Sequence, residues 1–381
     1  MKRLDKEVRV LVENGLQGPM SRRGFLKKAG AAGLLLGAGG LLAACGGSEE
    51  DTTSTTGEPQ LSDKLNFYNW SDYISEDTLP GFEEEYGVQV VYDNYSSNDE
   101  LLAKIQAGAA GFDIIVPTDY MITTMLGLDL LQPLDLDNIP NVTNLYQNFR
   151  EAPFDPGNKY SIPWQWGTTG IGYNSEKVTD FKPTWDMMWD EKYSGRITML
   201  SEIRDLFGVA LFKLGYSPNT RNAAEIDEAK ELLLEQKPLL KHYSTDTYID
   251  ELAANDSWLS HGWSGDVYQA QAENPAVMYA VPDEGAISWV DSMCIPKSAP
   301  HKYTAEVFMN YILEPEVGAA ITNYVWYPSP NEAAEEFVDP EILSDPGIYP
   351  PDEVMERLVF FEELGEDTEL YNKAYQEVMA G

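Results

Sequence analysis

The feature that most restricts the fold is an alternation of strand and helix patterns, which runs from about residue 64 to the C-terminus. Residues 88–92 and 112–117 are rich in β-branched and apolar side chains and predict strands, whereas residues 98–109 predict a helix. Strands that alternate with helices favour an α/β fold. The same patterns predict further strands at 64–68, 161–173, 196–200 and 276–282, and further helices at 223–234, 248–255, 352–364 and 368–379.

A length of 381 residues suits two domains, each large enough for a core of its own. Two extended segments are candidates for the connections between them. Residues 161–173 are punctuated by glycine and predict a first crossing, and residues 293–296 predict the return crossing. Ligands of open α/β sheets bind at the carboxyl ends of the strands, so the turns that follow the strands are where a site is expected.

The N-terminus predicts export from the cytoplasm. Arg22 and Arg23 lie in a twin-arginine export motif, and the apolar segment 29–44 follows them. At 16 residues this segment is short for a transmembrane helix and has the length of the apolar part of a signal peptide. An uncleaved anchor helix is the alternative, and either interpretation places the body of the protein outside the cytoplasmic membrane.

A lipid anchor is expected at the end of this signal. Residues 42–45 look like a bacterial lipobox, so cleavage would remove the signal peptide, residues 1–44, and leave the thiol of Cys45 to be lipidated. Residues 45–61 are rich in Gly, Ser, Thr and acids and predict a flexible acidic tether. We therefore expect an extracytoplasmic protein that touches the membrane through its lipid only.

The charge balance is strongly acidic. The chain has 26 basic and 63 acidic residues, and removal of residues 1–44 leaves 18 bases, 60 acids and a net charge of −42. Nucleic-acid backbones are recognised by Lys and Arg, so a nucleic-acid partner is excluded. A protein of this charge attracts cations, organic ones included. The alternative is an acidic surface that maintains solubility in a salty habitat.

Aromatic and acidic side chains recur together where strands are expected to end. The pairs and triplets are Trp70/Asp72/Tyr73, Asp119/Tyr120, Trp263/Asp266 and Trp289/Asp291. Carboxylates can pair with buried ammonium groups, and aromatic faces can pack against the methylenes between them. The combination indicates a site for an elongated organic cation. The alternative is ordinary core packing of Trp and Tyr beside capping acids.

Enzyme and metal motifs are missing from the sequence. His242, His261 and His301 stand far apart without metal-ligand spacing, and the chain contains no HExxH, Walker A or GxGxxG motif. Residues 262–266 end in Asp where a nucleophile elbow requires Gly. We expect no enzyme activity, cofactor or metal. Paired acids could serve a glycosidase, so a secreted hydrolase stays open, as does a binder of iron, thiamine or another small ligand.

Six segments in family order resemble the polyamine-binding (spermidine/putrescine) extracytoplasmic solute-binding proteins of ABC transporters. They are 69–73 (NWSDY), 116–118 (VPT), 262–267 (GWSGDV), 289–292 (WVDS), 327–331 (YPSPN) and 347–351 (GIYPP). The resemblance implies a monomeric, two-lobe periplasmic-binding-protein fold of type II, with the ligand cleft between lobes joined by two crossing strands. It implies permease subunits of the transporter as partners. The expected lobes are 62–165 with 293–332, and 166–292 with 333–381.

The resemblance also implies the residues of the ligand site. Those expected to line the stem of the amine are Trp70, Tyr73, Trp263, Trp289 and Tyr327, and those expected to meet its ammonium groups are Asp72, Asp205, Asp266 and Asp291, supported by Glu202. Those expected to form hydrogen bonds or complete the lining are Ser71, Thr118, Tyr120 and Ser244. Phe361 departs from the family, because spermidine binders tend to carry Gln there, and it favours putrescine. Asp72 and Asp266 also resemble putrescine binders, whereas Trp289 resembles spermidine binders, so spermidine stays open. We expect one ammonium between Asp72 and Asp291 and the other between Asp205 and Asp266.

Overall fold

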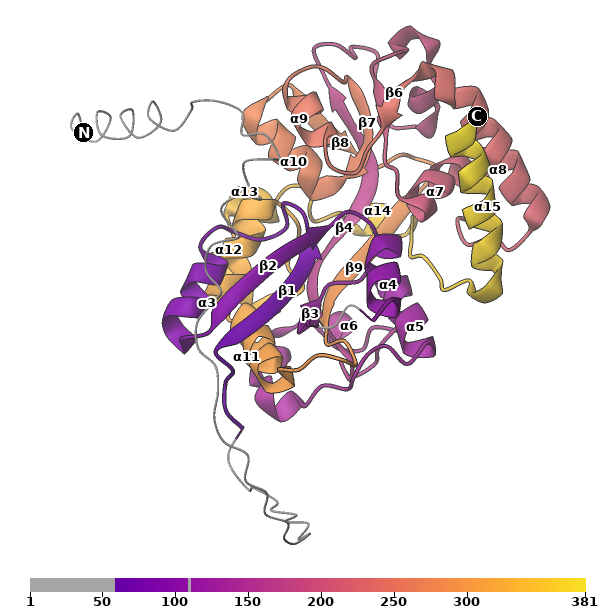
Figure 1. Cartoon of the computed structure of the whole chain (residues 1–381). Helices are drawn as coiled ribbons and strands as arrows, with labels where there is room; N and C mark the ends of the chain where they lie inside the picture. The colour runs from indigo at the N-terminus through magenta and orange to yellow at the C-terminus, as the bar shows by residue number, and fades with distance from the viewer. Residues whose placement is uncertain (1–58, 109–110) are drawn as a thin grey trace, which may run out of the picture. The chain divides into compact units, whose positions relative to one another are not determined.

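The structure is a computed structural model that describes residues 59–108 and 111–381 (Figure 1). The expected export signal, residues 1–44, and the expected lipidation site, Cys45, lie outside the described residues, as does the tether up to residue 58. Within the described part of the chain, none of the helices combines the length and the apolar character that a membrane span requires.

The described strands form one mixed sheet with the order β2-β1-β3-β9-β4-β7-β5-β6, to which β8 adds beside β4 and β10 beside β9. Their bounds are β1 (Lys64–Trp70), β2 (Gln89–Tyr95), β3 (Ile114–Ile115), β4 (Ser161–Asn174), β5 (Ile197–Met199), β6 (Leu240–Tyr243), β7 (Leu259–Trp263), β8 (Val277–Ala280), β9 (Ala286–Cys294) and β10 (Leu358–Val359). Strand β1 runs parallel to its neighbours β2 and β3, and β5 runs parallel to β6 and β7. Strand β4 is antiparallel to β7, β8 and β9.

Helices connect these strands and cover the sheet (Figure 1). The α-helices are α3 (Thr78–Tyr86), α4 (Asn98–Gln106), α5 (Asp119–Gly127), α6 (Gln147–Arg150), α7 (Ile203–Leu214), α8 (Ala223–Gln236), α9 (Tyr248–Ala253), α10 (Ser264–Glu273), α11 (Lys302–Ile312), α12 (Pro315–Val325), α13 (Pro340–Leu343), α14 (Asp352–Met355) and α15 (Thr368–Ala380). Short 3-10 helices are η1 (Leu136–Asn138), η2 (Pro140–Asn144), η3 (Trp185–Trp189), η4 (Glu191–Tyr193), η5 (Lys237–Leu239), η6 (Glu332–Phe337) and η7 (Gly365–Asp367). Helix α15 packs on α8 and α7.

Strands β4 and β9 form the centre of the sheet. They pair antiparallel from Ser161 opposite Cys294 to Thr169 opposite Ile287, and every residue of β9 is buried. Such continuous burial is typical of a strand that is covered on both faces. The architecture confirms the expected mixed α/β fold, whereas the expected lobe boundaries remain a prediction.

Two predicted elements near the site have different bounds. The helix predicted at 98–109 ends at Gln106, because Gly108 adopts a left-handed conformation with φ of 73° and stops the helix. The strand predicted at 112–117 has only two residues, Ile114–Ile115, and Pro117, which has no N–H for strand pairing, precedes Thr118, the N-cap of α5. Asp119 and Tyr120, the first two residues of α5, therefore lie close to the end of β3.

Two further predictions, of a helix and of the position of two site residues, were wrong. Instead of one helix at 352–364, the chain forms α14 and then the short strand β10, because Leu358 and Val359 pair with the start of β9. This pairing outweighs local helix propensity. Trp289 and Asp291 were expected before a crossing at residue 293, but both lie inside β9. Their side chains therefore reach the cavity from the middle of the sheet, where Trp289 packs on Tyr327 and Asp291 accepts a hydrogen bond from Thr118.

Candidate functional site

A cavity with about 680 Å³ of empty space, part of it open to solvent, lies where the turns β1–α3, β3–α5 and β7–α10 meet β9. The lining residues are Trp70, Ser71, Asp72, Tyr73, Tyr95, Ser96, Asn98, Thr118, Tyr120, Glu202, Asp205, Thr245, Asp246, Ile249, Trp263, Asp266, Trp289, Asp291, Tyr327 and Phe361.

All residues expected in the ligand site line this cavity except Ser244. The hydroxyl of Ser244 instead accepts hydrogen bonds from the backbone N–H groups of Asp246 and Thr247, at 3.2 and 2.9 Å, and so orders the turn before α9. Its neighbours Thr245 and Asp246 occupy the lining. A ligand contact of Ser244 therefore stays a prediction.

Sequence reasoning missed Tyr95, Ser96, Asn98, Thr245, Asp246 and Ile249 as lining residues. Most of them follow the carboxyl ends of β2 and β6, as the expected residues Ser71 to Tyr73 follow β1. The rule that sites form beyond the carboxyl ends of strands, applied to every strand, would have identified Ser96 and Asp246.

Six carboxyl groups line the cavity, and among the described residues no Lys, Arg or His side chain does. The carboxyl groups belong to Asp72, Glu202, Asp205, Asp246, Asp266 and Asp291. Buried charges are stable only when opposite charges or hydrogen-bond donors compensate them. The cavity therefore offers several acidic groups and no basic group to a ligand.

Asp291 lines the cavity from β9 and is 5% exposed. Its Oδ1 accepts a 2.7 Å hydrogen bond from the Thr118 hydroxyl, which in turn accepts one of 2.9 Å from Nδ2 of Asn98. Burial raises the pKa of Asp291 to about 8, although the Thr118 bond opposes the shift. Near neutral pH this carboxyl group is therefore largely protonated when no cation is present.

Asp266, in the first turn of α10, is held by two phenols. Tyr248 and Tyr327 donate hydrogen bonds of 2.7 and 2.6 Å to its two carboxyl oxygens. Burial raises the pKa of Asp266 to about 7, and the charges of Asp72 and Asp246 contribute to the shift. The neighbouring Gly265 is required for this packing, since a Cβ there would lie 2.5 Å from the Tyr327 ring.

Glu202 and Asp205 lie at the N-terminus of α7 and are both buried. Asp205 accepts a 2.8 Å hydrogen bond from Thr169 on β4, and burial raises its pKa to about 6. Glu202 accepts a 3.2 Å bond from the Tyr120 hydroxyl through Oε1, whereas its buried Oε2 has no partner among the described residues. A buried acceptor without a donor marks a position where a ligand can donate a hydrogen bond.

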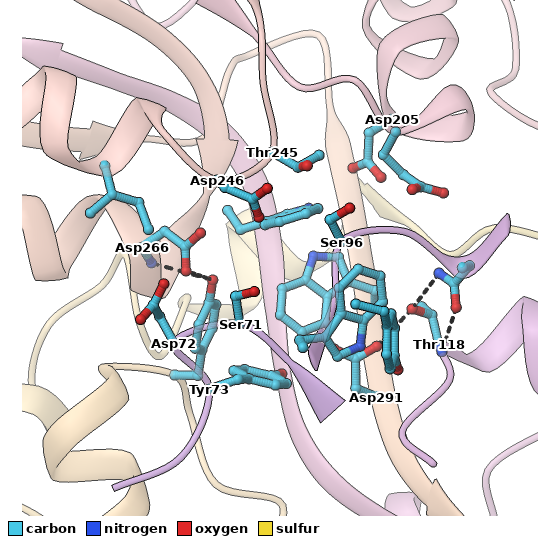
Figure 2. Close-up of a pocket in the computed structure, with 18 of the residues that line it drawn as sticks. Ser71, Asp72, Tyr73, Ser96, Thr118, Asp205, Thr245, Asp246, Asp266 and Asp291 are labelled. Carbon is cyan, nitrogen blue, oxygen red and sulfur yellow. Dashed lines mark hydrogen bonds between the residues drawn. The ribbon is translucent and has the colours of Figure 1, made fainter. Parts of the chain in front are cut away.

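The acids form two groups, and this grouping corrects the pairs expected from the sequence. Figure 2 shows Asp72, Asp246 and Asp266 together on one side of the cavity, away from Asp205. Asp72 and Asp246 raise the pKa of Asp266, whereas Asp205 is among the charges that raise the pKa of Asp291. Asp72 therefore belongs with Asp266 and Asp246, and Asp291 belongs with Asp205. We call these groups the outer acids (Asp72, Asp246, Asp266) and the inner acids (Glu202, Asp205, Asp291).

Aromatic rings line the space around and between the two groups. The Tyr73 and Tyr327 rings meet edge to face with centroids 5.1 Å apart, and the Trp289 ring lies 5.4 Å from Tyr327. The Trp70 indole donates a 2.9 Å hydrogen bond to the Val116 carbonyl, which fixes its orientation. An elongated ligand with cationic ends and an apolar middle complements this arrangement.

The described residues contain no cluster of three or more His, Cys, Asp and Glu side chains that could hold a metal ion. The hydroxyl groups nearest the acids, those of Thr118, Thr169, Tyr248 and Tyr327, donate hydrogen bonds to carboxyl oxygens. These donors hold the acids in place for a cation.

Comparison with known proteins identifies close relatives over most of the chain. A family model described as "Bacterial extracellular solute-binding protein" matches residues 81–350. The putrescine-binding periplasmic protein SpuD of Pseudomonas aeruginosa is 38% identical, over 83% of this chain and 92% of the relative.

Two solved structures are also similar. A putative spermidine/putrescine ABC transporter from Listeria monocytogenes has a TM-score of 0.80 and 35% identity, and the match covers 84% of this chain and 99% of that one. The TpPotD lipoprotein of Treponema pallidum has a TM-score of 0.74 and 31% identity, with coverage of 83% and 99%. Both support the mixed α/β solute-binding fold.

The buried acids predict an unusual pH dependence of stability for the ligand-free protein. Asp205, Asp266 and Asp291 have pKa values of about 6, 7 and 8, above the value of about 4 in an unfolded chain. The stability that these groups contribute is complete below their unfolded pKa and is lost as the pH rises through the folded values. Thermal melting should therefore show a lower Tm at about pH 8 than at about pH 5.

The matched variants for this measurement are Asp291→Asn and Asp137→Asn, since Asp137 is exposed and remote from the cavity. Asp291→Asn should reduce the loss of Tm between about pH 6 and pH 8, because the amide never ionises. Asp137→Asn should melt like the unmodified protein. If the Tm of Asp291→Asn changes with pH in the same way as the Tm of the unmodified protein, the raised pKa of Asp291 is refuted.

Proposed function

The chain belongs to the bacterial extracellular solute-binding proteins, and we propose that it captures a linear polyamine outside the cytoplasm and delivers it to an ABC importer. The observation that carries the proposal is the cavity with six carboxyl groups and no basic lining residue. The names of similar proteins, which refer to putrescine and spermidine, support it. The family consists of binding proteins, so the chain is assigned no enzyme activity.

Binding follows from the charges of the two acid groups. An ammonium group that leaves water must gain an anion, and the outer and inner acids supply anions at two places. The methylenes between the ammonium groups pack on the rings of Tyr73, Trp289 and Tyr327, and each cation–π contact contributes about 0.5–2 kcal/mol. The buried hydroxyl of Tyr73 faces the Asp291 carboxyl group and favours its ionised form, which is the form that pairs with an ammonium.

The length of the amine depends on the side of the cavity near Phe361. The apolar Phe361 ring faces Tyr120, with centroids 5.8 Å apart, and offers no hydrogen bond to a third ammonium. A lost hydrogen bond costs about 1–3 kcal/mol, or about ten- to hundredfold in affinity, and on this ground we propose that putrescine binds more tightly than spermidine. The free Oε2 of Glu202 is the acceptor that a third ammonium would use, so titration of both amines tests the preference directly.

We also propose twin-arginine export, cleavage before Cys45 and a lipid anchor, with 45–61 as the tether. A similar protein of Treponema pallidum is described as a lipoprotein, which supports the anchor. The anchored monomer would bind the amine between the expected lobes and pass it to the permease subunits. Closure of such lobes around a ligand is a known type of motion.

Calorimetric titration with putrescine and spermidine tests the function. Both amines should bind, and Asp291→Asn should weaken both by more than tenfold, because it removes the anion opposite a buried ammonium. The exposed control Asp137→Asn should bind like the unmodified protein. The proposal fails if neither amine binds to protein that a thermal melt shows to be folded.

Amine binding should release protons near neutral pH. Asp266 and Asp291 have pKa values of about 7 and 8 without ligand, so they are partly protonated there, and an ammonium nearby favours their ionised form. The observed binding enthalpy at about pH 7 should therefore change with the ionisation enthalpy of the buffer, and affinity should rise from about pH 5 to pH 8. Tight binding without proton release at that pH would contradict the assigned protonation.

The anchor has its own test. Mass spectrometry of protein from the membrane fraction of an expressing bacterium should find an N-terminus at Cys45 that carries a lipid, and Cys45→Ser should release the protein from the membrane. Replacing Arg22 and Arg23 by Lys should leave the precursor in the cytoplasm. A secreted product that keeps residues 1–44 would exclude this processing.

A further inference from the structure

Arg204 is a buried cation beside the inner acids that lies outside the cavity. It is the second residue of α7, is 6% exposed, and stands in the sequence between Glu202 and Asp205. A side chain at this position is long enough to pair with either carboxyl group. Its hydrogen bonds in the described structure go to neutral acceptors instead.

Three aromatic rings surround the guanidinium. Its Cζ atom lies 4.5 Å from the ring centroid of Phe361, 5.3 Å from that of Tyr371 on α15 and 5.5 Å from that of Tyr120 on α5. A guanidinium stacks well on aromatic faces, and such contacts are stronger away from water. We call these three rings the aromatic cage (Phe361, Tyr371, Tyr120).

Polar contacts tie Arg204 to the segment that carries Phe361. Nη1 donates a 3.1 Å hydrogen bond to the Glu362 carbonyl, and Nη2 donates one of 2.9 Å to Oδ1 of Asn219. The same Oδ1 of Asn219 accepts a 2.9 Å hydrogen bond from the Glu362 N–H. The Nδ2 of Asn219 donates a 2.8 Å hydrogen bond to the Phe360 carbonyl. The backbone on both sides of Phe361 is thus held by Arg204 and Asn219.

Two rings of the aromatic cage also form a wall of the cavity. Phe361 and Tyr120 line the cavity, whereas Arg204 does not. The guanidinium therefore lies behind this wall, and the space in front of it is left for a ligand.

The positive charge of Arg204 acts on the acids across this wall. It favours the ionised forms of Asp119, Glu202 and Asp205, whose pKa values are raised chiefly by burial. Burial lowers the pKa of Arg204 itself. The titratable and charged groups around this charge are Asp99 on α4, Asp119 and Tyr120 on α5, Glu202 and Asp205 on α7, Glu363 after β10 and Tyr371 on α15.

We propose that Arg204 is a positioning residue of the amine site, which fixes the Phe361 wall and places a positive charge beside Glu202 and Asp205 without entering the space that the ligand fills. This inference rests on the proposed polyamine binding and adds a residue outside the lining. If the cage did not hold it, the guanidinium could pair with Glu202 and compete with the ligand. The aromatic cage and the neutral acceptors prevent that pairing.

The experiment measures the affinity for putrescine between about pH 6 and pH 8.5 in the unmodified protein and in Arg204→Met and Arg204→Lys. Arg204→Met removes the charge, so it should bind at least tenfold more weakly near pH 6.5, and this deficit should shrink at higher pH, where the acids ionise unaided. Arg204→Lys keeps the charge but loses the planar contacts, so its affinity should fall by a similar factor at every pH.

Arg221→Met is the matched control, since Arg221 donates to the carbonyls of Glu363 and Leu364 but contacts no cage ring. It should keep the pH dependence of the unmodified protein. Thermal melting checks that each variant is folded. If Arg204→Met does not fold, Arg204→Gln replaces it as the neutral variant.

A deficit of Arg204→Met that is equal at every pH would overturn the proposed charge effect and leave a structural role only. Tighter binding by Arg204→Met would show that the charge repels the ligand and would also overturn the proposal. Absence of amine binding by the unmodified protein would instead refute the proposed function.

Discussion

Buried carboxyl groups without a basic partner are the constraint on which the site depends. Each of Asp205, Asp266 and Asp291 has hydrogen-bond donors, but these donors are neutral hydroxyl groups. Neutral donors offset only part of the free-energy cost of burying a charge. The part that they do not offset raises the pKa values of these three carboxyl groups. A cation that enters the cavity supplies the missing charge. The protein thus keeps an unfavourable arrangement in its ligand-free state, and the ligand relieves it.

The fold holds this arrangement because the acids come from elements that other contacts fix. Asp291 lies inside the buried strand β9, and Asp205 and Asp266 lie in the first turns of α7 and α10. Strand pairing and helix packing hold these backbones regardless of what fills the cavity. Asp72 differs, because it sits in an exposed turn with φ of 50°, a left-handed conformation that Asp tolerates better than most residues. The inner acids are therefore more rigidly placed than this outer acid.

The sequence predicted the α/β class, most strands, and the aromatic and acidic residues of the lining. These predictions depend on local patterns and on the rule for strand ends, both of which a sequence displays. It could not predict which acids share one side of the cavity, because Asp72 and Asp266 are distant in the chain and their proximity depends on the packing of whole elements. It also could not predict that 358–359 would pair with β9, since that pairing depends on a strand far away in the sequence. It could not predict that the Ser244 hydroxyl would accept hydrogen bonds from the turn before α9, because that geometry depends on the local backbone conformation.

Buried carboxyl groups of the cavity should lose protons when a polyamine binds. Infrared difference spectroscopy measures this directly, because protonated and ionised carboxyl groups absorb at different frequencies. At about pH 7, addition of putrescine should remove absorption of protonated carboxyl groups and increase that of carboxylates, and Asp291→Asn should reduce the change. Saturation with putrescine that leaves the carboxyl bands unaltered would contradict the account.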